Sequence, residues 1–341
     1  MSQTAEAPIQ VELTNKNNCQ AILCNFGCRL LSLQLSTRHG ASLDVILGYE
    51  TLQVYSKDQL CMGSFLGRVA GRIEHGRFTL NEQHYYLDCM PNGHYLHGGK
   101  EGLHNRVWQI HSQTSNSVTF SYHSPAGECG FPANLEIKVT YTLRDDNALE
   151  AVCQAIADDD TVFNPSYHPY FNLNGHDSGN ILNHQISINA STFAELREAL
   201  IPTGALLSVA ETPMDFRHPM AIGERINAND AQLVLAGGYD HPWVLNEECT
   251  DASIPAVIVQ GEISGVTLSV YTDRPSIVFY TGNFLPREWR GKEGASYSHQ
   301  QGFCLEPQCL PNSPNEKVFP SVVLRKGELF ETKTVYQFSE L

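Results

Sequence analysis

Four short segments of the chain combine ionisable side chains with aromatic, proline or glycine neighbours, and one of them carries the best candidate for proton transfer. His168 lies in the segment Asn164-Pro165-Ser166-Tyr167-His168-Pro169-Tyr170-Phe171-Asn172-Leu173. An imidazole changes its protonation state near neutral pH, and a following proline favours an extended backbone at the histidine. The aromatic neighbours would partly exclude water and offer a flat apolar face to a ligand. A structural histidine that caps a loop is the alternative interpretation.

Two carboxylates are the candidate partners of this histidine. Glu306 lies in the segment Phe303-Cys304-Leu305-Glu306-Pro307-Gln308. Its apolar neighbours predict burial, which raises the pKa of a carboxyl group and makes its anion a stronger base. Asp240 lies in the segment Gly237-Gly238-Tyr239-Asp240-His241-Pro242-Trp243. Each carboxylate could instead be an ordinary hydrogen-bonded one.

The remaining two segments carry candidate binding groups. Arg68 and Arg72 lie among small residues in Gly67–Ile73, where a guanidinium can donate several hydrogen bonds to a polyol, or simply be solvated. His97 precedes two glycines that would let the backbone approach a ligand closely, or that only form a tight turn. His94 and His97 have the H-x-x-H spacing of metal ligands, but no third ligand lies nearby in the sequence, so we predict no metal.

Strands are the elements expected to position these side chains, because the hydrophobic pattern mostly has a period of two. Leu135–Leu143 alternates, and after the polar turn 144–147 a second run, Leu149–Ile156, completes a hairpin. Further strands are expected at Phe78–Leu80, Tyr85–Leu87, Val107–His111, Val118–Tyr122, His184–Ala190, Val257–Gln260, Val266–Thr272, Ile277–Tyr280 and Glu328–Phe338. Ala194–Leu200 and Ala221–Asn227 are the candidate short helices. This spacing is typical of an all-β sandwich or barrel, and without a linker or repeat we expect one domain over residues 1–341.

The composition restricts the partners. The 341 residues carry a formal net charge of -15, which repels phosphate backbones and anionic lipid, so we expect neither nucleic acid nor membrane as a partner. Only 17% of the residues are charged, which suits binding a neutral polyol. The chain has no nucleotide-binding glycine motif and no H-E-x-x-H motif, so we predict no cofactor. Ten cysteines without a C-x-x-C pair, and an N-terminus that does not resemble a signal peptide, predict a reduced cytoplasmic protein.

Taken together and in order, these segments resemble the aldose 1-epimerase (galactose mutarotase) family. The resemblance covers roughly residues 20–340. It rests on Gly67–Ile73 with the hairpin at 78–87, Leu96-His97-Gly98-Gly99 with Val107-Trp108, His168–Leu173, Gly238-Tyr239-Asp240-His241, Tyr280–Leu285, Leu305-Glu306-Pro307-Gln308 and Phe319-Pro320-Ser321. It implies one large antiparallel β-sandwich and an isomerase that needs no cofactor.

The same resemblance assigns roles to five residues. Glu306 matches the general base and His168 the general acid, while Arg72, His97 and Asp240 match groups that bind the sugar. The implied reaction interconverts the α and β anomers of a free aldohexose such as galactose or glucose, by a monomer or a homodimer.

Two positions depart from the family pattern, and three other functions remain as alternatives. Gly71 stands where many members have Asn, and Val278 where many have Gln, which leaves the preferred sugar open. The alternatives are a glycoside hydrolase that uses Asp240 and Glu306, a mutarotase for hexose 6-phosphates, and a non-catalytic sugar-binding protein. The hydrolase would not need His168, the 6-phosphate enzyme should carry a further basic cluster, and mere binding needs neither a base nor an acid.

The protonation state of His168 depends on which of two opposing influences is stronger. Desolvation by Tyr167, Tyr170 and Phe171 lowers the pKa of the imidazole, whereas neighbouring carboxylates raise it. From the match of Glu306 and Asp240 to site positions, we expect the carboxylates to dominate and the pKa of His168 to lie above its ordinary value of about 6.5.

Overall fold

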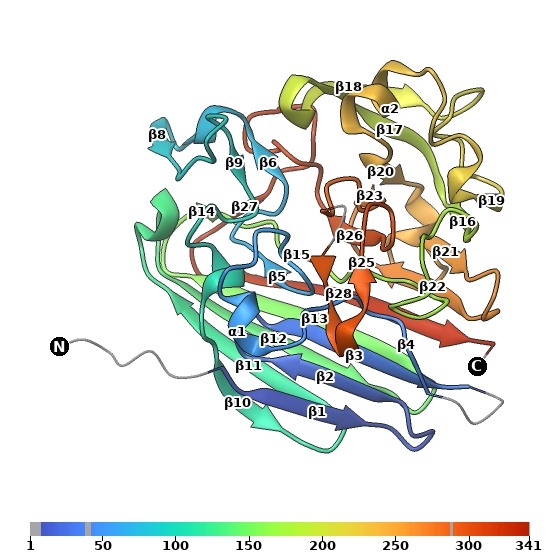
Figure 1. The fold of residues 1–341 in the computed structure, drawn as a ribbon. Coiled ribbons are helices and arrows are strands. Elements are labelled where there is room, and N and C mark those ends of the chain that lie inside the picture. The colour runs from blue at the N-terminus through green and yellow to red at the C-terminus, as the bar shows by residue number, and fades with distance from the viewer. Residues whose placement is uncertain (1–7, 38–41, 287–288, 341) are drawn as a thin grey trace.

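The computed structural model describes residues 8–37, 42–286 and 289–340, and strands dominate it (Figure 1). Every pairing between its named strands is antiparallel. The expected all-β, antiparallel sandwich is confirmed.

The large sheet contains the hairpin that the sequence predicts most clearly. Its strand order in the described part of the chain is β10 (Gln109–Gln113), β11 (Ser117–Ser124), β12 (Leu135–Leu143), β13 (Ala148–Ala157), β28 (Leu329–Ser339), β22 (Thr267–Thr272), β21 (Val257–Gln260), β16 (Gln185–Ile188) and β19 (Met220–Ala221). Along β12, buried residues alternate with more exposed ones, because successive side chains of a strand point to opposite faces. The buried face of this sheet forms one side of the core.

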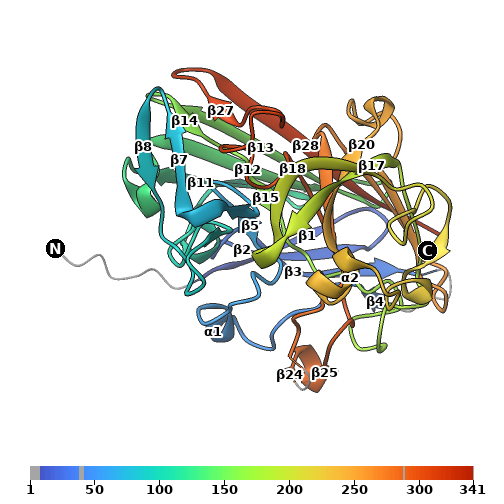
Figure 2. The same cartoon turned by 90° about the horizontal axis from the view of Figure 1, so that it is seen from above.

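A second layer, the N-terminal sheet, covers the β10–β13 half of the large sheet (Figures 1 and 2). Its strand order is β1 (Gln10–Thr14), β2 (Gln20–Cys24), β3 (Arg29–Ser36) and β4 (Ser42–Asp44). Side chains from both sheets, such as Leu23, Leu33, Ile137 and Val139, are fully or almost fully buried in one continuous core. Hydrophobic burial between the two layers therefore stabilises the sandwich.

A third sheet, which we call the cleft sheet, runs in the order β18 (Ile201–Ser208), β17 (Ala190–Arg197), β20 (Asp240–Leu245), β23 (Ser276–Tyr280) and β26 (Cys304–Gln308). Ile277, Phe279 and Leu305 point from one face of this sheet into the common core. Because the side-chain period of a strand is two, their neighbours Val278, Tyr280 and other alternate residues must point to the opposite face. That face borders the functional site.

Short elements connect the three sheets. Paired strands are β5 (Phe65–Leu66) with β15 (Ser166–Tyr167), β6 (Arg72–Ile73) with β9 (Tyr95–Leu96), β7 (Arg77–Leu80) with β8 (Gln83–Tyr86), β14 (Thr161–Val162) with β27 (Val323–Leu324), and β24 (Trp289–Arg290) with β25 (Ser296–Tyr297). The α-helices are α1 (Leu52–Tyr55) and α2 (Ala231–Ala236), and 3₁₀ turns occur at Glu74–Gly76, Leu103–Asn105, Glu128–Gly130, Glu198–Leu200, Ile222–Glu224, Glu247–Cys249 and Lys292–Gly294. None of the helices in the described ranges has both the length and the apolar character needed to cross a bilayer.

The two candidate helices are where the sequence analysis is wrong. Ala194–Leu200 belongs to strand β17 and a following 3₁₀ turn, and a β-bulge interrupts the strand pairing between Ala194 and Leu196. The bulge buries Phe193, Ala194 and Leu196, and this spacing imitates a helical face. Ala221–Asn227 contains the end of strand β19 and the 3₁₀ turn at Ile222–Glu224, where a Cβ on Gly223 would come within 2.8 Å of the Leu182 side chain.

A buried ion pair joins the N-terminal sheet to the loops of the site. Arg29, the first residue of β3, donates to Asp58 at 2.8 Å, and both side chains are completely buried. Asp58 also accepts hydrogen bonds from the Tyr49 hydroxyl and from the backbone N–H groups of Leu60 and Met62. Arg29 donates in addition to the carbonyl oxygens of Met62 and His104. One guanidinium–carboxylate pair thereby fixes two loops.

We expect Asp58→Asn to lower the free energy of unfolding by about 3–5 kcal/mol, because it leaves the buried Arg29 guanidinium without its counter-charge. The same exchange at the exposed pair of Lys16 and Asp145, Asp145→Asn, should lower the free energy of unfolding far less, because water screens that pair. Urea unfolding followed by tryptophan fluorescence measures both. Equal effects of the two substitutions would show that the buried pair does not hold this region together.

Candidate active site

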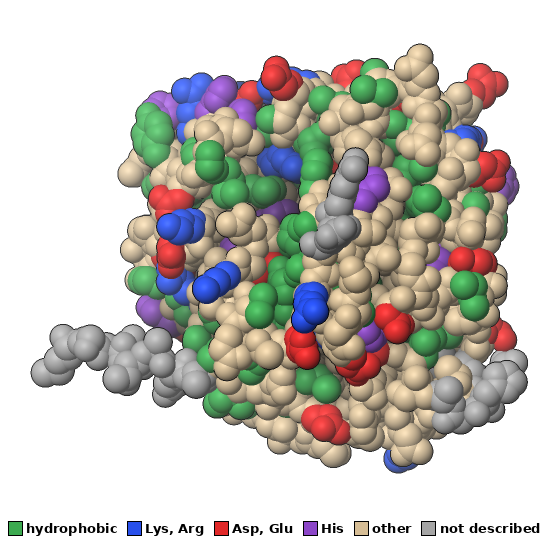
Figure 3. Space-filling view, in the orientation of Figure 1, with side chains coloured by type: hydrophobic (Ala, Val, Ile, Leu, Met, Phe, Trp, Pro, Cys, Tyr) green, Lys and Arg blue, Asp and Glu red, His purple; other side chains and the backbone are tan. Residues whose placement is uncertain are grey.

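A cleft of about 610 Å³ lies between the cleft sheet and the loops that precede and follow β6 and β9. Figure 3 shows hydrophobic side chains bordering the hollow. All five residues that the sequence analysis proposed for the site line this cleft: Arg72, His97, His168, Asp240 and Glu306. The structure thus brings together side chains that are up to 234 residues apart in the sequence.

Strand register places the two carboxylates on one face. Val278 of β23 lies between Pro242 of β20 and Glu306 of β26, and Tyr280 likewise lies between Asp240 and Cys304. Asp240 follows helix α2, whose N-terminus is capped by the Asp230 side chain and whose end is marked by Gly237 at φ 67°. The cap and the glycine therefore determine where β20 begins.

His168 is held by backbone hydrogen bonds on both sides. Its N–H donates to the Ser64 carbonyl at 2.9 Å, and its own carbonyl accepts from Gly63 N–H at 3.0 Å. The imidazole packs against Tyr170 and Tyr280, with ring centroids 5.0 and 6.3 Å away. This rigid, aromatic setting leaves the side chain 6% exposed.

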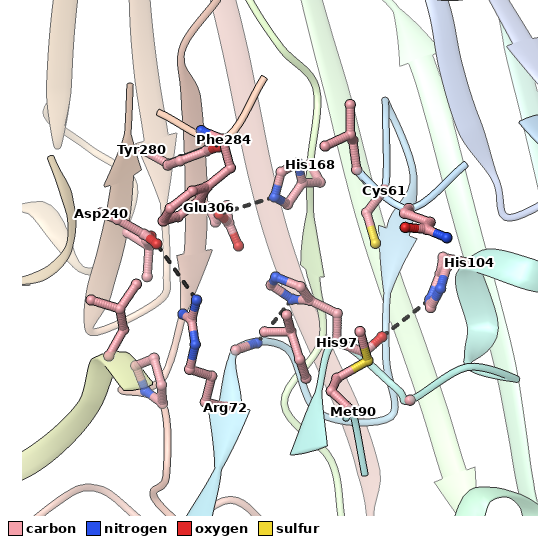
Figure 4. Close-up of a pocket in the computed structure, with 18 of the residues that line it drawn as sticks. Cys61, Arg72, Met90, His97, His104, His168, Asp240, Tyr280, Phe284 and Glu306 are labelled. Carbon is pink, nitrogen blue, oxygen red and sulfur yellow. Dashed lines mark hydrogen bonds and ion pairs between the residues drawn. The ribbon is translucent and has the colours of Figure 1, made fainter. Parts of the chain in front are cut away.

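Glu306 and His168 face each other across the cleft (Figure 4). His168 Nε2 lies 3.4 Å from Glu306 Oε1, and the glutamate side chain is only 4% exposed. Burial, and then the like charge of Asp240, raise the pKa of Glu306 well above its ordinary value. Burial also lowers the pKa of His168 to about 4, although Asp58 acts in the opposite direction.

The expectation that carboxylates would raise the pKa of His168 is therefore wrong. Desolvation dominates because it also raises the pKa of both carboxyl groups, which reduces the negative charge they can offer to the imidazole. The two shifts favour the neutral form of each group, a protonated Glu306 and an unprotonated His168. Such a pair gains and loses protons as one unit.

Arg72 and Asp240 lie beside this pair. Arg72 Nη2 is 3.7 Å from Asp240 Oδ2, with the two side chains 20% and 12% exposed. Burial raises the pKa of Asp240, and the charge of Arg72 opposes this shift. Arg68, by contrast, turns away from the cleft: it is buried and donates to Ser124 Oγ and to backbone carbonyls. Of the two neighbouring arginines, only Arg72 faces the site.

His97 presents a hydrogen-bond donor to the cleft. The N–H of Gly71 donates to His97 Nδ1 at 3.1 Å, so the neutral ring must carry its proton on Nε2. Burial, together with the charges of His168 and Arg72, lowers the pKa of His97 well below its ordinary value. The following Gly98 is required by packing rather than by a ligand, because its Cβ would lie 2.2 Å from the Gly67 carbonyl oxygen.

The same hydrogen bond disfavours a metal in this cleft. His97, His168 and Glu306 each offer a ligand atom within 4.8 Å of the others. A neutral histidine binds a metal through an unprotonated nitrogen, whereas His97 Nδ1 is engaged by Gly71 and its Nε2 carries a proton. His94 lies outside the group and stacks on His75, with ring centroids 5.1 Å apart. The donor set therefore fits proton transfer better than metal coordination.

Gln308 is a site residue that the sequence analysis did not single out. It is completely buried, lines the cleft, and its Nε2 lies 3.4 Å from Glu306 Oε2. A hydrogen bond to the carboxylate form of Glu306 opposes the upward shift of its pKa. Alternation along a strand was the available signal, since residues 306 and 308 must share a face.

Comparison with known proteins places the whole chain among sugar epimerases. A model of the aldose 1-epimerase family matches residues 10–337. Galactose mutarotases of Bos taurus and Homo sapiens are 38% identical to this chain over 317 residues, which cover 93% of it and 90% of each relative. The aldose 1-epimerase of Escherichia coli (strain K12) is 35% identical over 331 residues, covering 96% of this chain and 94% of that protein.

Solved structures agree with this assignment. The structure of an aldose epimerase homologue from C. elegans has a TM-score of 0.90 and 32% identity, covering 98% of this chain and 99% of that one. The galactose 1-epimerase of Lactobacillus acidophilus has a TM-score of 0.86 and 26% identity, with coverages of 99% and 96%. Both the sequence and the fold are thus shared over almost the full length.

We expect His97 to remain in its neutral Nε2–H tautomer at about pH 6.5, where an ordinary histidine is half protonated, because burial lowers its pKa well below that value. Nitrogen-15 NMR of the histidine rings distinguishes the two nitrogens and measures this directly. Addition of Zn²⁺ should leave the His97 signals in place. A zinc-dependent change at His97 Nε2 would contradict the tautomer argument and favour a metal site.

Proposed function

Because the chain belongs to the aldose 1-epimerase family, we propose that Glu306 and His168 are the general base and general acid of that family's reaction. The protein is an isomerase that interconverts the α and β anomers of a free aldose, and the resemblance seen in the sequence is confirmed. One observation supports the two roles: Glu306 Oε1 lies 3.4 Å from His168 Nε2 inside a buried cleft.

Ring opening follows from the positions of these two groups. With the anomeric hydroxyl at Glu306 and the ring oxygen O5 at His168, the carboxylate removes the O1 proton while the imidazolium donates its proton to O5. The C1–O5 bond breaks, and C1 becomes an aldehyde carbon. Rotation about C1–C2 presents the other face of the aldehyde, and the reverse transfers close the ring as the opposite anomer. Both residues regain their starting states, so the cycle consumes no co-reactant.

Binding of the sugar shifts Glu306 and His168 toward the protonation state that ring opening needs. Burial favours a protonated Glu306 and an unprotonated His168, which is the reverse of what ring opening requires. A bound O1–H donates more strongly to a carboxylate than to a carboxylic acid, and O5 accepts more strongly from an imidazolium than from a neutral imidazole. Substrate binding therefore favours the form with ionised Glu306 and protonated His168.

Arg72, His97 and Asp240 are proposed to bind the sugar hydroxyls. Arg72 and the Nε2–H of His97 are donors, and Asp240 is an acceptor when ionised, so the three complement groups that both donate and accept. D-galactose and D-glucose are the proposed substrates. The apolar Val278 side chain lies opposite Glu306 in the strand register, which places an apolar surface next to the base.

The wider setting is likewise proposed. We propose one domain over residues 1–341, since the buried core draws on all three sheets. The ten cysteines are free, which supports a reducing compartment such as the cytoplasm. We also propose that the protein acts without nucleic acid, as a monomer or a homodimer.

Glu306→Gln should lower kcat by about 10²–10⁴-fold with a smaller change in KM, because the amide keeps the shape of the base but cannot accept the O1 proton. Polarimetry on freshly dissolved α-D-galactose and α-D-glucose measures the rate. The same exchange at the exposed strand position Glu136, Glu136→Gln, is the control and should leave the rate unchanged. Near-normal turnover by Glu306→Gln would remove this residue from the base role.

The pH profile of kcat/KM should be bell-shaped, because the pair must hold one proton, and each limb can be assigned. Below the acid limb the pair takes up a second proton; this limb should lie near pH 4, since burial lowers the pKa of His168 to about 4. Above the basic limb the pair loses its only proton; this limb should lie above the ordinary glutamate value of about 4.3, since the pKa of Glu306 is raised.

His168→Asn tests the assignment. With the acid gone, residual activity should only rise with pH as Glu306 ionises, so the basic limb should disappear. A variant that stays active and keeps the full bell would show that His168 is not the acid.

A further inference from the structure

The cleft extends beyond the acid–base pair to an end that the proposed mechanism does not use. This end, which we call the distal end, is lined by Gln59, Cys61, His104 and Asn105, together with the buried Asp58. Asp58 is occupied by its ion pair with Arg29. Figure 4 shows Cys61 and His104 on the side of His168 that is remote from Glu306, whereas Asp240 and Arg72 lie on the opposite side.

His104 offers an unused hydrogen-bond acceptor at the distal end. Its Nδ1 lies 3.1 Å from the His97 carbonyl oxygen, and since a carbonyl only accepts, Nδ1 must carry the proton. Burial, and then the charge of Arg29, lower the pKa of His104 to about 4, so the ring is neutral and Nε2 keeps its lone pair. Within the described residues this Nε2 has no hydrogen-bond partner. The atom is also not sealed from solvent, so a ligand in the cleft can reach it.

A second acceptor lies one residue further along. Asn105 donates through Nδ2 to the Lys100 carbonyl at 2.9 Å, which fixes the orientation of the amide. Its Oδ1 is buried and has no partner in the described part of the chain. This oxygen is sealed from solvent, so the acceptor that a ligand in the distal end can reach is His104 Nε2.

The position of the sugar follows from the reaction, and this step rests on the proposed function. In an aldohexopyranose, O5 is bonded to C1 on one side and to C5 on the other. If O1 is at Glu306 and O5 is at His168, then C5 and its substituent C6 lie past His168. C2 and C3 lie back toward Asp240 and Arg72, and the C6 hydroxyl enters the distal end.

We propose that the distal end is a subsite for the C6 hydroxyl of a hexopyranose, with His104 Nε2 as its hydrogen-bond acceptor. Acceptors suit a hydroxyl, which can donate, and they do not suit a phosphate, which accepts. The subsite therefore selects unphosphorylated hexoses over both hexose 6-phosphates and sugars that lack O6.

The unmodified enzyme provides the first test. D-fucose is D-galactose without O6, and polarimetry gives kcat/KM for both sugars. We expect D-galactose to be favoured about two- to tenfold, the range that one neutral hydrogen bond supplies. Equal kcat/KM values for the two sugars would overturn the subsite, while activity on neither sugar would instead contradict the proposed function.

Two substitutions of His104 test the roles of its ring nitrogens Nδ1 and Nε2 separately. His104→Asn retains a donor close to the place of Nδ1, for the His97 carbonyl, and removes Nε2. We expect it to lower kcat/KM for D-galactose to the value for D-fucose and to leave D-fucose within twofold of the unmodified enzyme. His104→Gln places its amide near the Nε2 position and gives up the bond to His97, so it should lower kcat/KM for both sugars by a similar factor.

The opposite pattern would overturn the proposal. If His104→Asn lowers kcat/KM for both sugars equally, the ring acts only by holding His97 in place. If His104→Asn retains the preference for D-galactose, another group binds O6. Circular dichroism of each variant controls for folding, and the comparison of the two sugars on the unmodified enzyme decides the question even where a variant does not fold.

Discussion

Removal of water from two facing ionisable groups is the constraint on which the rest of this structure depends. Glu306 and His168 would each hold their charge easily in solvent, yet only a few per cent of either side chain is exposed. Burial disfavours the carboxylate and the imidazolium alike, so neither charge is stable without the other or without a ligand. The enclosing strand β26, the aromatic rings around His168 and the backbone hydrogen bonds of residue 168 all serve to keep the two atoms close and dry.

The same constraint disfavours charge on the titratable groups of the cleft, in a protein of net charge -15. Burial lowers the pKa of His97, His104 and His168, and raises that of Asp240 and Glu306. Fixed tautomers then decide what each ring offers: a backbone N–H makes His97 a donor at Nε2, and a backbone carbonyl makes His104 an acceptor at Nε2. These oriented neutral dipoles, together with the Arg72 guanidinium, match the hydroxyl groups of a neutral polyol.

Sequence alone predicted most of the strands and selected five residues that the fold places in one cleft, and it failed where geometry depends on the fold. Alternation identified β12 and β13 because one face of each is buried, whereas a bulge disguised β17 as a helix. The residues around His168 indicated two opposing influences on its pKa, desolvation by aromatic rings and attraction by carboxylates. Only the depth of burial in the folded protein decides which influence is larger. Gln308 shares a strand face with Glu306 and was therefore accessible to pattern analysis. The acceptor at His104 was not, because it depends on a contact with the His97 carbonyl.

The order of the strands has a consequence for synthesis of the chain on the ribosome. Strand β28 (Leu329–Ser339) lies in the middle of the large sheet, bonded to β13 on one side and to β22 on the other. Until residues 329–339 have emerged, the two halves of this sheet have no shared strand, and β13 and β22 present unpaired edges. The nascent protein therefore passes through a long stage in which both edges are open to pairing with other chains. Chaperone binding at that stage has an evident target, since β28 is the last strand of this sheet to be made.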